Sequence, residues 1–82
     1  MSELQADVIS IIENVLKMPA GILNIDSGMG ITDGWTSLMM MEIIMAVENK
    51  FSIQFQPDEI YDMVNVRDIL LSLKNHGVYN AN

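Results

Sequence analysis

Apolar residues recur along residues 3–17 at the spacing of a helix that buries one face. The intervals are i, i+4, i+7, i+8, i+11 and i+12, which place the side chains in one stripe. Ser2 is suited to cap the start of this helix, and Pro19 and Gly21 are expected to end it. The stripe consists of Leu4, Val8, Ile11, Ile12, Val15 and Leu16.

The next segment, residues 18–35, has no helical or strand-like spacing. Four of the five glycines and one of the two prolines lie there. We therefore expect a long loop, and loops of this length in compact domains are often functional. Five apolar side chains are expected to hold it against the core, namely Ile22, Leu23, Ile25, Met29 and Ile31.

A second helix is predicted over residues 37–51, and it has two apolar faces. Thr36 is its expected N-cap, because a hydroxyl there accepts an otherwise unpaired first-turn N–H. One face is typical of a core and consists of Met40, Ile43, Val47 and Phe51. The adjacent face begins at Ser37 and forms an apolar strip edged by acid, with Met41, Ile44, Met45 and Glu48.

Two shorter helices are predicted in the last third of the chain. Pro57, followed by two acids, indicates a helix over about 57–62. Asn65 and Asp68 resemble a capping box for a last helix over about 66–76. The buried stripe of this last helix is Ile69, Leu70 and Leu73, and Lys74, His76 and Gly77 suit its C-terminus.

Residues 51–55, with the sequence FSIQF, alternate like a strand but have no partner strand. We expect an extended connection there, with Ile53 and Phe55 tucked inward.

These patterns together predict an all-α fold, a four-helix bundle in which the third helix is short. The length fits one domain over residues 1–82, with a core over about 3–76 and a frayed tail over 77–82.

The charge of the chain is strongly negative, with eleven acidic against four basic residues and a net charge of −7. Such a surface repels nucleic acid and anionic lipid and attracts basic protein surfaces. The alternative is that the negative charge serves only solubility, as it does in many small domains. No uncharged run is long enough for a membrane span, and acids in residues 1–20 exclude a secretory signal. A cytoplasmic monomer is the expectation.

Ser37 lacks the groups that would make it a catalytic nucleophile. The single histidine, His76, lies near the far end of the last predicted helix, and no G-x-S-x-G elbow surrounds the serine. Residues 26–37 superficially suggest a calcium loop, but Gly28 and Gly30 occupy positions that require oxygen ligands. No phosphate-binding loop and no cysteine are present, so we expect neither an enzyme nor a metal site.

The position of Ser37 offers something else, because the free N–H groups and the dipole of a helix N-terminus favour an anion. A phosphate attached to this hydroxyl would be electrostatically favoured there. The base and the metal needed to attach it would have to come from another protein.

The stretch GWTSLMMMEIIMAVENKFSIQFQPDEI, residues 34–60, resembles the modification-site region of acyl carrier proteins and peptidyl carrier proteins. Their usual pattern is Asp-Ser-Leu before a helix rich in Leu, Met, Val and Glu. An extended stretch follows, and Pro, Asp and Glu then open a short third helix. The first helix and the ending VRDILLSL fit as well, so the resemblance covers residues 3–75. A tryptophan two residues before the serine, here Trp35, resembles a subset of free-standing bacterial carriers, which often read Gly-Trp-Asp-Ser-Leu.

The resemblance implies that a phosphopantetheinyl transferase, using magnesium, moves 4′-phosphopantetheine from coenzyme A onto Ser37. The thiol of this arm would carry acyl, aminoacyl or polyketide cargo as a thioester. The implied partners are the transferase, a loading ligase and downstream synthase enzymes with basic docking surfaces. Positions where the family meets its partners correspond to Asp33, Trp35, Thr36, Leu38, Met41, Glu42, Ile44, Met45 and Glu48.

Two questions stay open from the sequence. Three consecutive methionines, residues 39–41, span about 200° of helix, so at least one is exposed, and they serve either the core or adaptable partner contacts. Thr36 stands where the family usually has an acid that assists the transferase. Its presence leaves an alternative, an acidic helical docking module that keeps the carrier fold and is never modified. The sequence does not identify the cargo.

Overall fold

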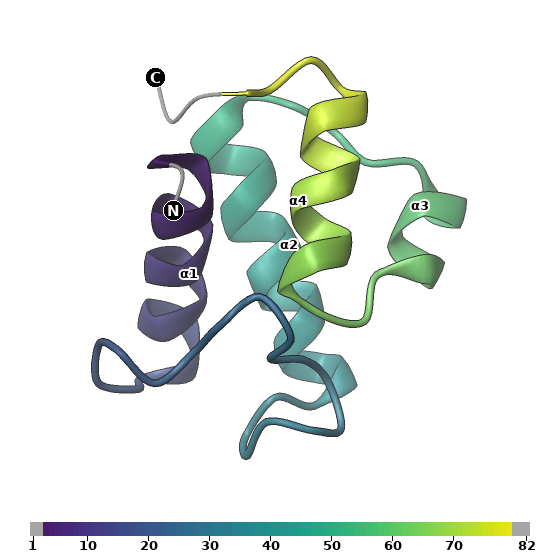
Figure 1. Ribbon diagram of the computed structural model, residues 1–82. Coiled ribbons are helices and arrows are strands. Elements are labelled where there is room, and N and C mark those ends of the chain that lie inside the picture. Colours follow the sequence, from purple (N-terminus) through teal and green to yellow (C-terminus); the bar gives the residue numbers. More distant parts are fainter. Residues whose placement is uncertain (1–2, 80–82) are drawn as a thin grey trace.

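The computed structural model describes residues 3–79 and contains four helices in this range (Figure 1). The all-α four-helix fold is therefore confirmed, whereas the expected cap Ser2 and the last three residues lie outside the described range. Among the described residues no helix has the length and apolar character needed to cross a membrane. The helices are α1 (Glu3–Leu16), α2 (Ser37–Phe51), α3 (Pro57–Asp62) and α4 (Val66–Asn75).

Three of the helices build the core, because α1 packs against both α2 and α4. The short α3 lies beyond α4 on the side away from α1 (Figure 1) and has no buried residue of its own. Its neighbours Phe55 and Met63, which flank it in the chain, are buried and hold it to the bundle. The fully buried aliphatic side chains are Leu4, Val8, Ile12, Ile43, Ile44, Val47, Val66, Ile69 and Leu73.

The long loop between α1 and α2 is held at fewer points than the sequence suggested. Leu23 is buried, and Ile25 and Met29 are partly buried against the core. Ile22 and Ile31, however, are 56% and 76% exposed, so their predicted anchoring is wrong. Each directly follows a solvent-exposed glycine with positive φ, where the chain turns at the surface instead of running along the core.

Backbone hydrogen bonds fasten this loop to the start of α4. The N–H of Met29 donates to the carbonyl of Val64 at 2.7 Å, and the N–H of Val66 donates to Ser27 at 3.0 Å. At Gly28, a Cβ atom would lie 2.5 Å from the Val64 oxygen, so only glycine permits this approach. The loop thereby satisfies first-turn N–H groups of α4 that a helix leaves unpaired.

Side chains complete the start of α4. The Asn65 side chain accepts a hydrogen bond from the N–H of Asp68 at 2.9 Å, so the predicted N-cap is confirmed. The Asp68 carboxylate accepts from Val64, one residue before the cap, at 2.9 Å. In the predicted capping box the Asp68 carboxylate would accept from the N–H of the cap residue, Asn65. It accepts from the preceding residue instead, where the carbonyl of Val64 is bonded to the loop.

A side-chain hydrogen bond joins the first turn of α3 to the C-terminal end of α4. His76, at the C-terminus of α4, places Nε2 2.9 Å from the carboxylate of Glu59, and its ring lies edge-on to Phe55. Glu59 also accepts a hydrogen bond from the N–H of Gln56 at 2.8 Å. The Gln56 bond first, and then His76, lower the pKa of Glu59 below its ordinary value of 4.5.

This lowered pKa predicts how acid affects stability. A carboxyl whose pKa is lower in the folded than in the unfolded protein stabilises the fold above its unfolded pKa, and this contribution is lost as pH falls through the folded pKa. We expect Glu59→Gln to lower the Tm at about pH 6, and the difference from the parent protein to shrink as pH falls below about 4.5. Thermal unfolding followed by circular dichroism across this range measures both; a difference that is constant with pH contradicts the assignment.

Candidate functional site

Ser37 is the first residue of α2 and is exposed. The preceding Thr36 has extended backbone, and its hydroxyl accepts a hydrogen bond from the N–H of Met39 at 3.2 Å. The carbonyl of Thr36 accepts from Met40 at 2.9 Å. The predicted N-cap is confirmed, and the exposed Ser37 follows it as the first residue of the helix.

Two backbone donors beside this hydroxyl are unused. Thr36 satisfies the third and fourth N–H groups of the helix end, whereas those of Ser37 and Leu38 have no partner within residues 3–79. They lie at the positive end of the dipole of a 15-residue helix. An oxyanion next to the serine would therefore meet two N–H donors and a favourable field.

The segment that leads into Ser37 is fixed by a buried tryptophan. Trp35 is 1% exposed, its backbone N–H donates to the carbonyl of Thr32 at 3.1 Å, and its carbonyl accepts from the backbone N–H of Gly30 at 3.1 Å. The Thr32 hydroxyl in turn accepts from the N–H of Gly28 at 3.0 Å. We expected Trp35 to contact partners; its burial corrects this, because the ring is an anchor for the loop and is covered by the core.

The site contains no chemistry that would activate the serine. His76 is engaged with Glu59 at the C-terminal end of α4. Within the described range, no group of three or more His, Cys, Asp or Glu side chains is arranged to hold a metal ion. The only histidine of the chain is therefore not a neighbour of Ser37 in the fold.

The exposed face of α2 begins next to this serine. Leu38, Met41 and Met45 are 71%, 47% and 61% exposed, and Glu42 is exposed between them. Met40 is buried, so the methionine run divides between core and surface. Large apolar side chains that remain in solvent beside an acid form a surface suited to another protein.

Ile44 does not belong to this face. It is 2% exposed, and it lies with Met40, Ile43 and Val47 in the inner stripe at positions i, i+3, i+4 and i+7. The expectation that Ile44 contacts partners is therefore corrected. The error arose because residue 44 lies at the border of two stripes that the sequence could not rank.

Glu48 has a structural role that the sequence did not reveal. Its carboxylate accepts a hydrogen bond from the half-buried N–H of Phe55 at 2.8 Å, and its carbonyl accepts from Ile53 at 3.2 Å. The residue after the helix, Ser52, adopts a left-handed conformation, which turns the chain back toward this carboxylate. Glu48 therefore closes the turn after α2 with one oxygen of its carboxylate.

A comparison of the sequence with models of protein families shows the family to which the chain belongs. Residues 6–72 match the family described as "Phosphopantetheine attachment site". The chain belongs to this family. It is thus a carrier domain of the kind to which 4′-phosphopantetheine is covalently attached, and such carriers interact with modifying transferases and with biosynthetic enzymes.

The fold of this carrier domain also occurs in a solved structure, a candidate acyl carrier protein from Mycobacterium tuberculosis. The two share 18% sequence identity with a TM-score of 0.80, over 89% of this chain and 97% of that one. A search of curated proteins found no match. At this identity the similarity supports the acyl-carrier-like fold and no finer assignment.

The role of Glu48 is open to a direct test. Glu48→Ala is expected to lower the free energy of unfolding by about 1–2 kcal/mol, because it leaves the N–H of Phe55 unpaired. The matched change Glu42→Ala, on the exposed face of the same helix, should change it by less than about 0.5 kcal/mol. Chemical denaturation measures both, and equal effects would show that the bond to Phe55 does not support the turn.

Proposed function

We propose that Ser37 is the residue of this carrier domain that bears the arm, and that the arm carries an acyl, aminoacyl or polyketide group as a thioester. The observation that carries the proposal is an exposed serine at the first position of a long helix, inside the segment matched to the family. When bound, the arm supplies the thiol that this cysteine-free chain lacks.

The other serines within residues 6–72 are less suitable. Ser27 uses its hydroxyl to accept from the N–H of Asn24 at 2.9 Å. Ser10 and Ser72 lie inside α1 and α4, where the backbone N–H groups already donate to carbonyls of the same helix and are not available to a phosphate. Ser52 follows the C-terminal end of α2, where the dipole disfavours a phosphate.

The residues at Ser37 fit a phosphodiester. In the transfer step the hydroxyl oxygen bonds to the phosphorus that bears the pantetheine, and the bond to the departing adenosine 3′,5′-bisphosphate breaks. The hydroxyl proton passes to a base of the transferase, since the single histidine of this chain is bonded to Glu59 at the C-terminal end of α4. The N–H groups of Ser37 and Leu38 are the donors available to the phosphate oxygens.

Partner enzymes would meet the exposed face of α2 and the loop before it. Leu38, Met41 and Met45 supply apolar contact, and methionine adapts to differently shaped partners. Glu42 and Asp33 supply charges that make no hydrogen bond or ion pair within the described residues, which favours basic docking surfaces.

A second candidate, the unmodified docking module, is supported by Thr36. Its side chain serves as a cap and supplies no negative charge next to the serine. If the transferase requires such a charge, Ser37 would remain free, and only the docking face would act.

Mass spectrometry separates the two candidates. After incubation with coenzyme A, magnesium and a transferase of broad specificity, we expect the intact mass to rise by one 4′-phosphopantetheine. Ser37→Ala should abolish the gain, and Ser10→Ala, which removes an exposed hydroxyl from α1, should leave it unchanged. No gain with several transferases would support the unmodified module, and a gain that persists in Ser37→Ala would move the attachment elsewhere.

Thr36→Asp is expected to increase the rate of modification several-fold. Aspartate keeps an oxygen for the N–H of Met39 and adds the missing charge at the helix N-terminus. Thr36→Asn is the matched control, because it keeps a capping oxygen without the charge. Initial rates of mass gain compare the three proteins; if Asp and Asn behave alike, charge at this position does not limit the transferase.

A further inference from the structure

The position of Ser37 depends on what precedes it in the chain, because it is the first residue of α2. The first N–H groups of a helix have no carbonyl partner within that helix, and helix ends fray unless other groups hold them. Thr36 and Ser37 are both exposed, so the nearest buried side chain on this side is that of Trp35. Whatever fixes Trp35 therefore also fixes the start of the helix.

Thr32 makes three hydrogen bonds in the turn that leads to Trp35. Its backbone N–H donates to the carbonyl of Gly28 at 2.8 Å, and its hydroxyl accepts from the N–H of Gly28 at 3.0 Å. Its carbonyl accepts from the backbone N–H of Trp35 at 3.1 Å. Thr32 thus lies between Gly28 and Trp35 and is bonded to both.

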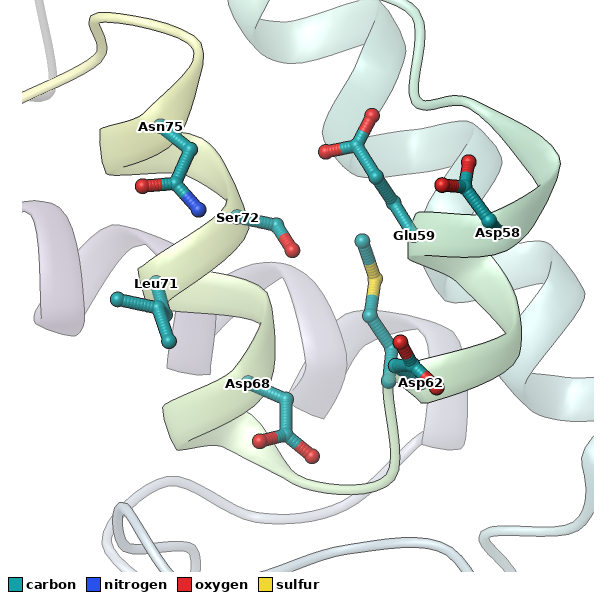
Figure 2. A pocket seen from close by; sticks show the side chains of 8 residues that line it. Asp58, Glu59, Asp62, Asp68, Leu71, Ser72 and Asn75 are labelled. Carbon is teal, nitrogen blue, oxygen red and sulfur yellow. The ribbon is translucent and has the colours of Figure 1, made fainter.

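The far end of this chain of bonds is fixed to the start of α4. Gly28 forms an isolated antiparallel bridge with Asn65, and the N–H of Met29 donates to the carbonyl of Val64 at 2.7 Å. Figure 2, which looks into the groove between α3 and α4, shows the connection that leads into Asp68 in the first turn of α4. The Asp68 carboxylate accepts from the N–H of Val64 at 2.9 Å, so the anchor of the loop is itself held.

The hydroxyl of Thr32 is the one part of this arrangement that a side chain supplies and that can be removed alone. It accepts from the N–H of Gly28, a buried residue. A buried donor left without an acceptor is costly, so the turn would open to pair this N–H with water. Because Trp35 is bonded to the carbonyl of the same threonine, an open turn would loosen the backbone that leads into Ser37.

We infer that Thr32 is a positioning residue for the modification of Ser37, which acts through Trp35 and holds the serine where a docked transferase can reach it. The inference rests on the proposed attachment at Ser37. A transferase that recognises the exposed face of α2 would still bind a variant of Thr32, because that face is unchanged. The hydroxyl of the serine would, however, meet the reacting phosphorus less often in the right geometry, and reaction rates depend steeply on such alignment.

Steady-state kinetics of arm attachment test the inference, with coenzyme A, magnesium and the transferase of broad specificity. Thr32→Val keeps the branched shape of the side chain and removes the hydroxyl. We expect kcat to fall about threefold or more, while KM for the carrier changes by less than about twofold. Thr32→Ser restores the hydroxyl and should return kcat to within about twofold of the parent value. A purely structural role would instead lower the folded fraction, which raises KM at unchanged kcat.

Ser27→Ala is the matched control in the same loop. It removes another hydroxyl that accepts from a backbone N–H, that of Asn24 at 2.9 Å, but this bond does not lead to Trp35. Its kcat should stay within about twofold of the parent value. Equal losses in Thr32→Val and Ser27→Ala would indicate general loosening of the loop and overturn the inference. An unchanged kcat in Thr32→Val, or a loss that Thr32→Ser does not restore, would overturn it as well.

A second measurement needs no transferase and is made on the unmodified ¹⁵N-labelled chain. In Thr32→Val, amide hydrogen exchange should be about threefold faster or more at Trp35 and Met40, whose N–H groups donate to the carbonyls of Thr32 and Thr36. Amides in the middle of α1 and α4 report global opening and should change less. Equal changes throughout the chain, or no change at these two amides, would contradict the inference. The mass test of Ser37 in the parent protein is read separately, so a failure of the proposed attachment is distinguishable from a failure of the role of Thr32.

Discussion

The burial of Trp35 is the constraint on which the functional end of this carrier domain depends. The ring is 1% exposed, while Ser37, two residues later, is exposed as the first residue of α2. A bulky ring held in a close-packed interior fixes the backbone on either side of it, because interiors of this density resist displacement. The start of α2, and Ser37 with it, is thereby held at the surface, although a long loop leads to it.

The same helix must pack and also offer a surface, and its side chains divide between these tasks one by one. Met40 and Ile44 face the core, and Met41 and Met45, each one position further along, remain exposed. The two carboxylates divide likewise: Glu48 closes the turn at Phe55, whereas Glu42 has no partner among the described residues. In a chain of this size most apolar side chains are needed for the core, and a side chain that is buried there is not available on the exposed face of the helix.

Local patterns in the sequence were sufficient for the helices. Each bound lies within one residue of its prediction, because caps such as Thr36 and Asn65 act on donors three residues away. Contacts between distant segments were not readable. Three features depend on how the helices are arranged in space, which the spacing of apolar residues does not determine. They are the approach of Gly28 to Val64, the contact of His76 with Glu59 and the burial of Ile44. The proposed attachment position rests on a local signal, whereas separating exposed residues of α2 from packing residues needed the fold.

Net charge was a poor guide to partners until the fold assigned each acid. A value of −7 is compatible with simple solubility, because charge spread evenly over a surface selects nothing. Six acids bond a backbone N–H or a basic side chain, and four of the remaining five lie beside or on α2, as Asp33 and Glu42, and on α3, as Asp58 and Asp62. Excess charge that the fold does not use is therefore concentrated beside exposed leucine and methionine. That coincidence of free charge with apolar surface, more than the total charge, is what supports the proposal that the exposed face of α2 binds basic proteins.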